Sequence, residues 1–135
     1  MIKKYWQVKY LVVQCKKIKG SDFLRVNKEL LKGSTSLLVL SLLKVEDMYG
    51  YQMIKRLKEK SENVFEFQEG TLYPILHSLE EKNYISSYWD NTGPKKRKYY
   101  SITKSGMQQL QQSKKEWQTF SNGINLVVGG ALFEY

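Results

Sequence analysis

Hydrophobic residues recur at helical spacing in three segments of the chain, which therefore predict three helices. The first segment, residues 26–43, is rich in leucine and is followed by the polar pair Glu46-Asp47. The second and third segments are residues 49–60 and 69–80. The stripes expected to be buried in these two helices are Gly50, Met53, Ile54 and Leu57, and Leu72, Ile75, Leu76 and Leu79.

After the third helix the pattern changes to strands rich in aromatic and β-branched residues. Residues 84–89 and 97–103 are predicted strands, and residues 90–96 between them hold the glycine and proline of a turn. Alternation over residues 64–67 also favours a short strand ahead of the third helix. A helix for the DNA major groove followed by a hairpin is typical of a winged helix-turn-helix.

A long last helix is predicted for residues 104–128, with Thr103 as its cap and Gly129-Gly130 as its end. Along it a heptad spacing runs through Met107, Leu110, Lys114, Trp117, Ser121, Ile124 and Val128. A solitary helix with such a stripe needs a partner, so we expect two copies of the chain to form a homodimer. The expected dimer contacts are Leu110, Trp117, Phe120, Ile124 and Val128.

These patterns predict a mainly α fold with a small β-hairpin, in which a winged helix-turn-helix is followed by a long C-terminal dimerisation helix. The DNA-binding domain would span residues 23–103, the dimerisation helix residues 104–128 and a tail residues 129–135. Residues 1–22 are a basic N-terminal extension. They are interpreted either as an arm that reaches DNA or as a disordered segment or translated leader.

Composition excludes several classes of protein. The chain has 135 residues, enough for one domain, and its single cysteine, Cys15, permits neither an intrachain disulfide nor a cysteine cluster for zinc. No apolar run is long enough to span a bilayer and the start lacks a signal-peptide pattern, so we expect a soluble, cytoplasmic protein. Residues 1–32 hold +7 of the net charge of +9, so local clusters matter more than the total.

The third helix and the hairpin carry a distinctive series of residues in a fixed order. The series is Gly70-Thr71-Leu72-Tyr73-Pro74, Leu76, Leu79, Ile85, Gly93-Pro94, Arg97-Lys98-Tyr99-Tyr100, Ile102-Thr103 and Gly106. It resembles the signature of PadR-like transcriptional regulators, and the likeness covers residues 27–128. It is similar to the short subclass, which has one C-terminal helix. The resemblance implies a homodimeric repressor that binds a palindromic operator in double-stranded DNA.

Two groups of residues are candidates for DNA binding. On the face of the third helix opposite its apolar stripe lie Thr71, Tyr73, Pro74, His77 and Ser78, although the helix could also be a plain amphipathic helix of a small domain. The second group is a run of cations beside Gly93-Pro94, at a hairpin tip where side chains project from the core. These cations, expected to contact phosphate or the minor groove, are Lys95, Lys96, Arg97 and Lys98.

Trp117 has two interpretations. An aromatic residue on a heptad seam is ordinarily core. The resemblance to short PadR-like regulators instead implies that the tryptophans of two subunits face each other across a flat cavity for small planar aromatic ligands. Catalysis is not expected, because His77 is the single histidine and no nucleophile is assembled around it. There is no metal-ligand spacing and no phosphate-binding loop, so no metal and no cofactor are expected.

Two alternatives from other classes stay open at this point. A winged helix can be a protein-protein interaction module that never binds DNA, which a gel shift would decide. The basic residues 1–19 could hold the chain on a membrane surface, but they form no clear amphipathic helix.

Overall fold

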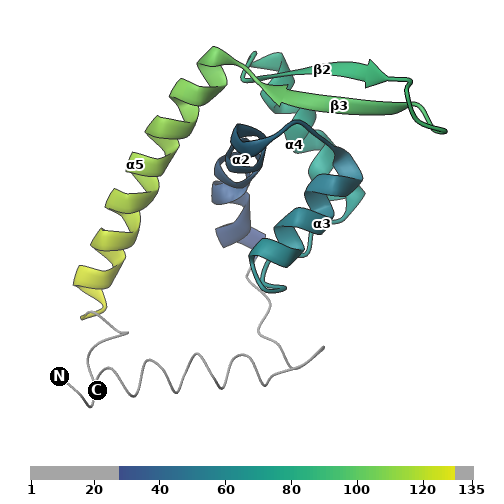
Figure 1. Ribbon diagram of the computed structural model, residues 1–135. Coiled ribbons are helices and arrows are strands. Elements are labelled where there is room, and N and C mark those ends of the chain that lie inside the picture. The colour runs from purple at the N-terminus through teal and green to yellow at the C-terminus, as the bar shows by residue number, and fades with distance from the viewer. Residues whose placement is uncertain (1–27, 130–135) are drawn as a thin grey trace. The chain divides into compact units, whose positions relative to one another are not determined.

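The structure, a computed structural model, describes residues 28–129 (Figure 1). Its elements in chain order are helix α2 (Lys28–Val45), strand β1 (Met48–Tyr49), helices α3 (Gly50–Lys60) and α4 (Glu69–Glu81), strands β2 (Ile85–Asp90) and β3 (Arg97–Ile102), and helix α5 (Lys104–Val127). Two compact units are distinguished, one formed by Val26–Lys115 and one that includes the chain from Glu116 onward. The predicted extension, residues 1–22, and the end of the tail, residues 130–135, lie outside the described residues.

The core of the first unit lies where α2, α3 and α4 meet one face of the sheet. Its buried side chains include Val39, Leu40, Leu42, Leu43, Met48, Met53, Leu57, Leu72, Leu76, Leu79, Ile85 and Tyr100. The predicted apolar stripes are confirmed, except that Ile54 and Ile75 are only partly buried. Burying an aliphatic side chain of this size stabilises the fold by about 1.5–3 kcal/mol. The core therefore fixes α4 with its opposite face toward solvent.

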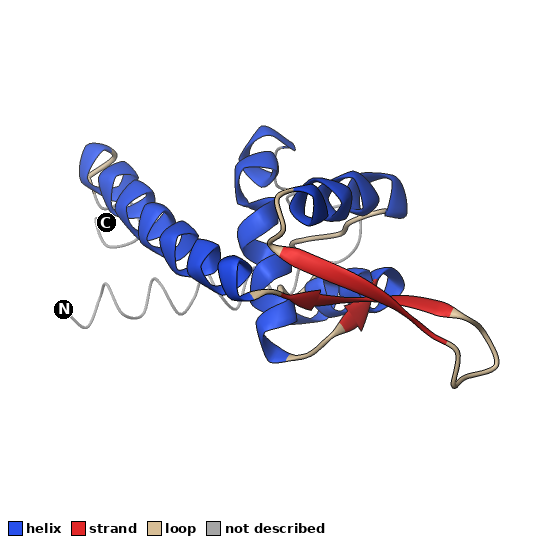
Figure 2. Cartoon of the chain, turned by 90° about the horizontal axis from the view of Figure 1, so that it is seen from above, coloured by secondary structure: helices blue, strands red, loops and turns tan. Residues whose placement is uncertain are grey.

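The hairpin belongs to a three-stranded antiparallel sheet with the order β1-β3-β2. In the middle strand, Tyr99 pairs with Tyr49 of β1 and with Tyr88 of β2. Because side chains alternate between the faces of a strand, Tyr100 points toward the helices and is buried, whereas Tyr99 stays on the outer face. Figures 1 and 2 show β2 and β3 crossing one side of the helices and extending past them at the hairpin end.

The prediction of a short strand over residues 64–67 was wrong, because this segment is an irregular connection between α3 and α4. It follows a tight turn in which Glu62 and Asn63 have positive φ angles of 51° and 71°. The N–H of Phe65 donates to the Ser61 hydroxyl at 2.9 Å, and Phe67 is buried in the core. The alternation thus reflects packing of phenylalanines and not strand pairing. The third strand of the sheet is β1, which the sequence pattern did not indicate.

The first turn of α5 is fastened to the turn between α4 and β2. Thr103 caps the helix as predicted, since its hydroxyl oxygen accepts the N–H of Gly106 at 3.0 Å. The hydroxyls of Thr103 and Ser105 both donate to the carbonyl oxygen of Asn83, at 2.6 and 2.8 Å. A β-carbon on Gly106 would lie only 2.0 Å from the carbonyl oxygen of Tyr84. Glycine is therefore required for this close approach.

In the second unit the structure describes the C-terminal half of α5 and two residues after it. The helix runs to Val127, and Gly129 has a φ of 81°, which is the left-handed conformation that ends many helices. This agrees with the predicted end. No helix among residues 28–129 is long and apolar enough to cross a membrane.

Candidate nucleic-acid interface

Helix α4 presents a polar face opposite its buried stripe. Thr71, Tyr73, Pro74 and His77 are exposed on this face, and Ser78 is half-buried. The imidazole of His77 lies 3.1 Å from the carboxylate of Glu81, one turn further along the helix. The residues predicted to read bases thus share one surface, with Ser78 at its edge.

Tyr73 also sets how α4 packs on α3. A β-carbon at Gly50, the first residue of α3, would lie 2.6 Å from the Tyr73 hydroxyl oxygen, so the phenol rests directly on this glycine. Tyr73 as a whole is 44% exposed. It therefore combines helix packing with a surface position. In the sequence, Gly50 at the start of the second apolar stripe was the sign of this contact.

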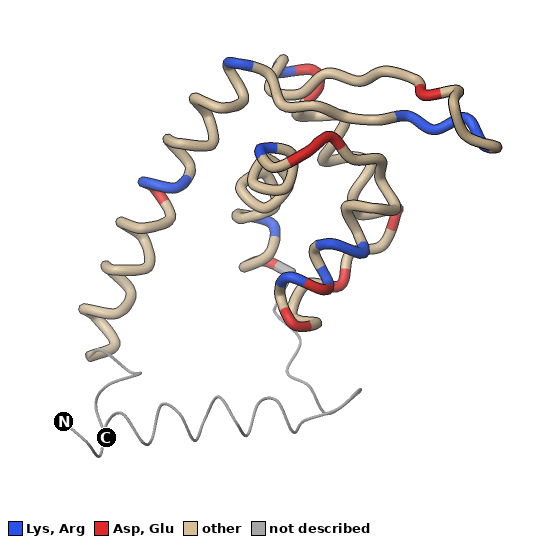
Figure 3. The backbone as a smooth tube through the Cα atoms, in the orientation of Figure 1, with Lys and Arg blue, Asp and Glu red and all other residues tan. Residues whose placement is uncertain are grey.

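The hairpin of β2 and β3, called the wing below, has a turn that is shaped by Asp90. Its carboxylate accepts hydrogen bonds from the hydroxyl of Thr92 at 2.6 Å and from the N–H of the same residue at 2.9 Å. These bonds, and to a smaller degree the charge of Arg97, lower the pKa of Asp90. The carboxylate is therefore engaged within the turn, and the cations that follow it lie in the turn and at the start of β3 (Figure 3).

Two of the exposed wing cations stack on aromatic rings. The ammonium of Lys96 lies 4.9 Å from the centre of the Trp89 ring, and the guanidinium of Arg97 lies 4.6 Å from the centre of the Tyr49 ring. Contacts of this kind contribute about 0.5–1 kcal/mol at exposed sites. Lys95 makes no such contact with the described part of the chain. The wing therefore presents cations whose side chains are partly fixed in place.

Lys98 departs from the prediction that all four cations face DNA. It lies on the inner face of β3, where its ammonium is 4.0 Å from Glu80 of α4 and 5.6 Å from the centre of the Tyr100 ring. Glu80 also accepts a hydrogen bond from the hydroxyl of Ser87. Burial, and to a lesser degree the charge of Glu80, raises the pKa of Tyr100. Lys98 and Glu80 thus join β3 to α4, a contact with no local signal in the sequence.

A row of tyrosines crosses the outer face of the sheet at the base of the wing. The ring centres of Tyr49 and Tyr99 are 5.4 Å apart, and those of Tyr88 and Tyr99 are 5.8 Å apart with nearly parallel planes. The hydroxyl of Tyr88 donates to Asp47 at 2.8 Å, and this bond is the main reason why the pKa of Tyr88 is raised. The row ties all three strands together and supports the Arg97 side chain.

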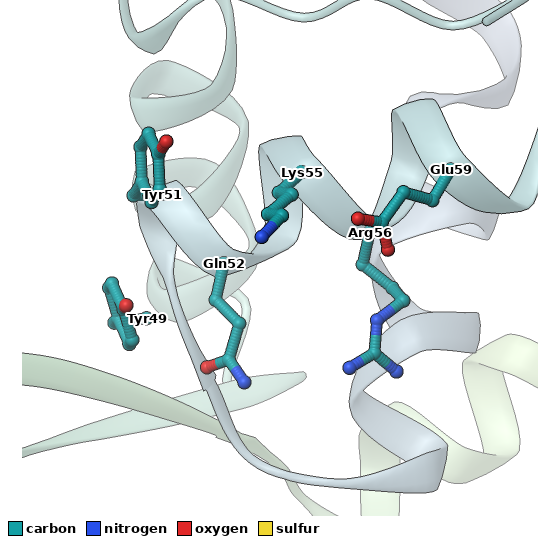
Figure 4. Close-up of a pocket in the computed structure, with 6 residues that line it drawn as sticks. All are labelled: Tyr49, Tyr51, Gln52, Lys55, Arg56 and Glu59. Carbon is teal, nitrogen blue, oxygen red and sulfur yellow. The ribbon is translucent and has the colours of Figure 1, made fainter.

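A shallow groove of about 250 Å³ lies along α3 (Figure 4). Its lining residues are Tyr49, Tyr51, Gln52, Lys55, Arg56 and Glu59. Small-molecule sites are mostly enclosed and apolar, whereas this groove is open and polar. It therefore gives no support to an effector site. Since the first helix of a helix-turn-helix crosses the DNA backbone, the exposed Tyr51 and Lys55 are further candidates for phosphate contacts that the sequence reasoning missed.

The C-terminal half of α5 carries exposed apolar side chains on the predicted seam. Trp117 is 50% exposed, and Phe120, Ile124 and Val128 are similarly exposed. The rings of Trp117 and Phe120 lie 6.0 Å apart. Leu110 contradicts its assignment to the dimer contacts, because it is 0% exposed and belongs to the core of its own protomer. Trp117 is half exposed and therefore is not part of the core of a single chain.

The described residues hold no group of three or more histidine, cysteine, aspartate or glutamate side chains that could bind a metal ion. His77 contacts Glu81 on an exposed helix surface, which is an arrangement suited to solvent or DNA. The chemistry of the site therefore lies in its polar helix face and its cationic hairpin.

Comparison with known proteins gives a consistent result. The profile of the Transcriptional regulator PadR-like family matches residues 39–112. A structure of a transcriptional regulator from Clostridium thermocellum is 34% identical, with a TM-score of 0.69 over 73% of this chain and 96% of that one. A PadR family transcriptional regulator from Eggerthella lenta is 35% identical, with a TM-score of 0.65 over 74% of this chain and 82% of that one. The Escherichia coli transcriptional regulator YqjI is 27% identical over 74% of this chain and 47% of its own length.

Proposed function

The chain belongs to the PadR-like family of transcriptional regulators, and we propose that it is a homodimeric repressor that binds a palindromic operator. Proteins of this family are regulators and not enzymes. In the proposed complex, two copies of α4 enter successive major grooves of half-sites about one helical turn, roughly 34 Å, apart. The two wings hold the flanking phosphates. Such a repressor acts beside the chromosome, in the cytoplasm.

The observation that carries this proposal is the pairing of a polar helix face with a cationic wing on one compact unit. Thr71, Tyr73 and His77 are exposed on α4, and the wing that is joined to this helix through Glu80 exposes Lys95 and Lys96. Helix residues of this kind can contact base edges, whereas the cations bind phosphates without reading sequence. In the proposed complex, α4 thus supplies contacts that specify the DNA sequence, and the wing supplies contacts that position the protein on the DNA.

A binding titration across salt concentrations tests the wing. DNA from upstream of the protein's own gene is the first probe, since regulators often control neighbouring genes. The double variant Lys95→Ala, Lys96→Ala removes four proposed phosphate contacts from a dimer. The slope of log K against log salt is therefore expected to fall by roughly 3–4 units, at about 0.9 per contact.

The matched control is the double variant Lys60→Ala, Lys82→Ala. These lysines lie at the C-terminal ends of α3 and α4, away from the N-terminal turns proposed to face DNA. The control removes the same charge, so its salt slope should stay close to that of the wild type. Equal slopes in both double variants and the wild type would contradict the wing assignment. Absence of any gel shift would favour the alternative of a protein-docking module.

We further propose that α5 forms the dimer seam and that Trp117 lines a ligand cleft there. The exposed rings of Trp117 and Phe120 support this, because exposed apolar stripes of this kind are usually covered by a partner. A planar aromatic ligand between two indoles would gain about 0.5–1.5 kcal/mol per ring pair beyond its burial. Ligand binding would then relieve repression by shifting the distance between the two α4 helices.

A planar dye titrated into the full-length dimer tests the Trp117 cleft. Dye binding is expected to quench tryptophan fluorescence, and Trp117→Ala is expected to abolish the quenching while the dimer persists in sedimentation. If Trp117 is only seam core, Trp117→Ala should instead destabilise the protein by roughly 3–5 kcal/mol, and the wild type should show no response to the dye.

A further inference from the structure

We propose that Trp89 is an apolar DNA contact of the wing, which packs on the sugar edges of the minor groove beside phosphates bound by Lys95 and Lys96. The inference rests on the proposed function, because it adds a residue of a different chemical type to the same DNA surface. Trp89 would supply an apolar contact, whereas the neighbouring lysines supply charge.

The position of Trp89 in the hairpin is the first support. It is the last inward-facing residue of β2 before the turn, and it pairs with Lys98 of β3. On the same face Ile85 is buried, and Ser87 is half-buried and bonded to Glu80 of α4. Trp89 itself is 55% exposed. Helix α4 therefore contacts the inner face at Ser87 and Lys98, whereas Trp89, nearer the turn than Ser87, stays half exposed. Figure 1 shows that the hairpin end of β2 and β3 extends past the helices.

The surroundings of the indole are the second support. The ammonium of Lys96 lies 4.9 Å from the ring centre, and Lys95 is exposed one residue earlier in the chain. The nearby carboxylate of Asp90 is engaged by Thr92 within the turn. The Trp89 ring is thus an apolar surface bordered by the positive charges of Lys95 and Lys96. In the minor groove, deoxyribose edges lie between two rows of phosphates, and apolar side chains are often inserted there.

More than half of the Trp89 surface stays exposed in the folded chain. Tryptophan is largely buried in most proteins because its large apolar surface gains from leaving water. A ring that stays half exposed at a cationic hairpin gains that burial only when a partner covers it. A phosphate-rich partner is also the one that the neighbouring lysines attract.

The test compares single variants of the full-length protein on one operator fragment, titrated over a range of salt concentrations. Trp89→Ala is expected to weaken binding about tenfold or more at every salt concentration and to leave the salt slope unchanged, since an apolar contact releases no counterions. Lys95→Ala should instead lower the salt slope by about 0.9 per subunit, because it removes a proposed phosphate contact. Leu30→Ala is the matched control, because Leu30 is an apolar residue that is 63% exposed on α2 and belongs neither to the wing nor to α4.

A spectroscopic measurement guards against a folding artefact. Protein labelled with 5-fluorotryptophan should show one fluorine resonance that is missing in Trp89→Phe, and this resonance should shift when the operator is added. Trp89→Phe should bind with an affinity between those of the wild type and Trp89→Ala.

Three outcomes would overturn the inference: an unshifted Trp89 resonance, a Trp89→Ala affinity within about twofold of the wild type, or equal losses in Trp89→Ala and Leu30→Ala. Failure of the wild type to bind any fragment would instead overturn the proposed function.

Discussion

Replacing Gly106 by alanine is expected to weaken the attachment of α5 to the DNA-binding unit. The new β-carbon would lie 2.0 Å from the carbonyl oxygen of Tyr84 and 2.8 Å from a side-chain carbon of Ile102. Ordinary contacts begin at 3.4 Å, so the helix turn and the Tyr84 backbone would have to separate by about 1.4 Å. The carbonyl is held by the N–H of Thr103 at 3.0 Å and cannot turn away freely.

Two costs and one gain determine how much stability the Gly106→Ala variant loses. Forcing an extra carbon into a packed site costs about 1–3 kcal/mol. Stretching the hydrogen bonds from Thr103 to Tyr84 and from Ser105 to Asn83 costs about 0.5–1.5 kcal/mol each. Alanine stabilises the helix by about 1 kcal/mol relative to glycine, because it is the better helix former. The free energy of unfolding should therefore fall by roughly 1–5 kcal/mol, which lowers Tm by at least about 4 °C for a domain of this size.

Thermal unfolding of two glycine variants measures this effect. Gly33→Ala is the control, because a β-carbon at Gly33 in α2 meets nothing within 4 Å. Only the helix-propensity gain applies there, so Tm should rise by a few degrees, at about 4–8 °C per kcal/mol. The two variants should thus shift Tm in opposite directions. A Tm for Gly106→Ala at or above the wild-type value would refute the close approach of α5 to Tyr84.

Three other changes have expected outcomes. Ile124→Asp would bury like charges in the proposed seam, so sedimentation should show monomers, and an intact dimer would place the interface elsewhere. Glu80→Gln keeps a partner for Ser87 but removes the charge facing Lys98, so the salt slope of DNA binding should steepen by up to about 0.9 per subunit. An unchanged slope would mean that Lys98 stays on the inner face. The fold raises the pKa of Tyr88 from 10.0. The hydrogen bond from Tyr88 to Asp47 therefore stabilises the protein at pH values below the pKa of the unfolded state, and this stabilisation is lost as the pH rises through the pKa of the folded state. Melting curves above about pH 10 should then show the wild type losing stability relative to Tyr88→Phe, and parallel curves would contradict this.

Much of the fold could be predicted from periodicity alone. Leu72, Leu76 and Leu79 recur at helical spacing and are buried, because a helix of a small domain has one face in the core. Strand alternation likewise puts Tyr99 and Tyr100 on opposite faces of β3, and Tyr100 is the buried one. These patterns are local, so they are visible in a sequence without knowledge of what lies opposite.

The remaining features depend on contacts between distant residues. Strand β1 has two residues, and only its pairing with β3 defines it. Lys98 was assigned to DNA because it belongs to a run of cations, whereas strand alternation and the position of Glu80 turn it inward. Leu110 fits the heptad spacing as well as Ile124 does, yet the core of its own protomer covers it. A spacing pattern shows which residues share a face but not which partner covers that face.

The stacking of Lys96 on Trp89 and of Arg97 on Tyr49 has a consequence for the thermodynamics of complex formation. A free lysine or arginine side chain loses up to about 2 kcal/mol of rotamer entropy when it is immobilised. In this hairpin part of that loss occurs when the protein folds, so less of it opposes association with a partner. The wing is thus preorganised, and rigid contacts of this kind lower Kd mainly through a slower dissociation rate.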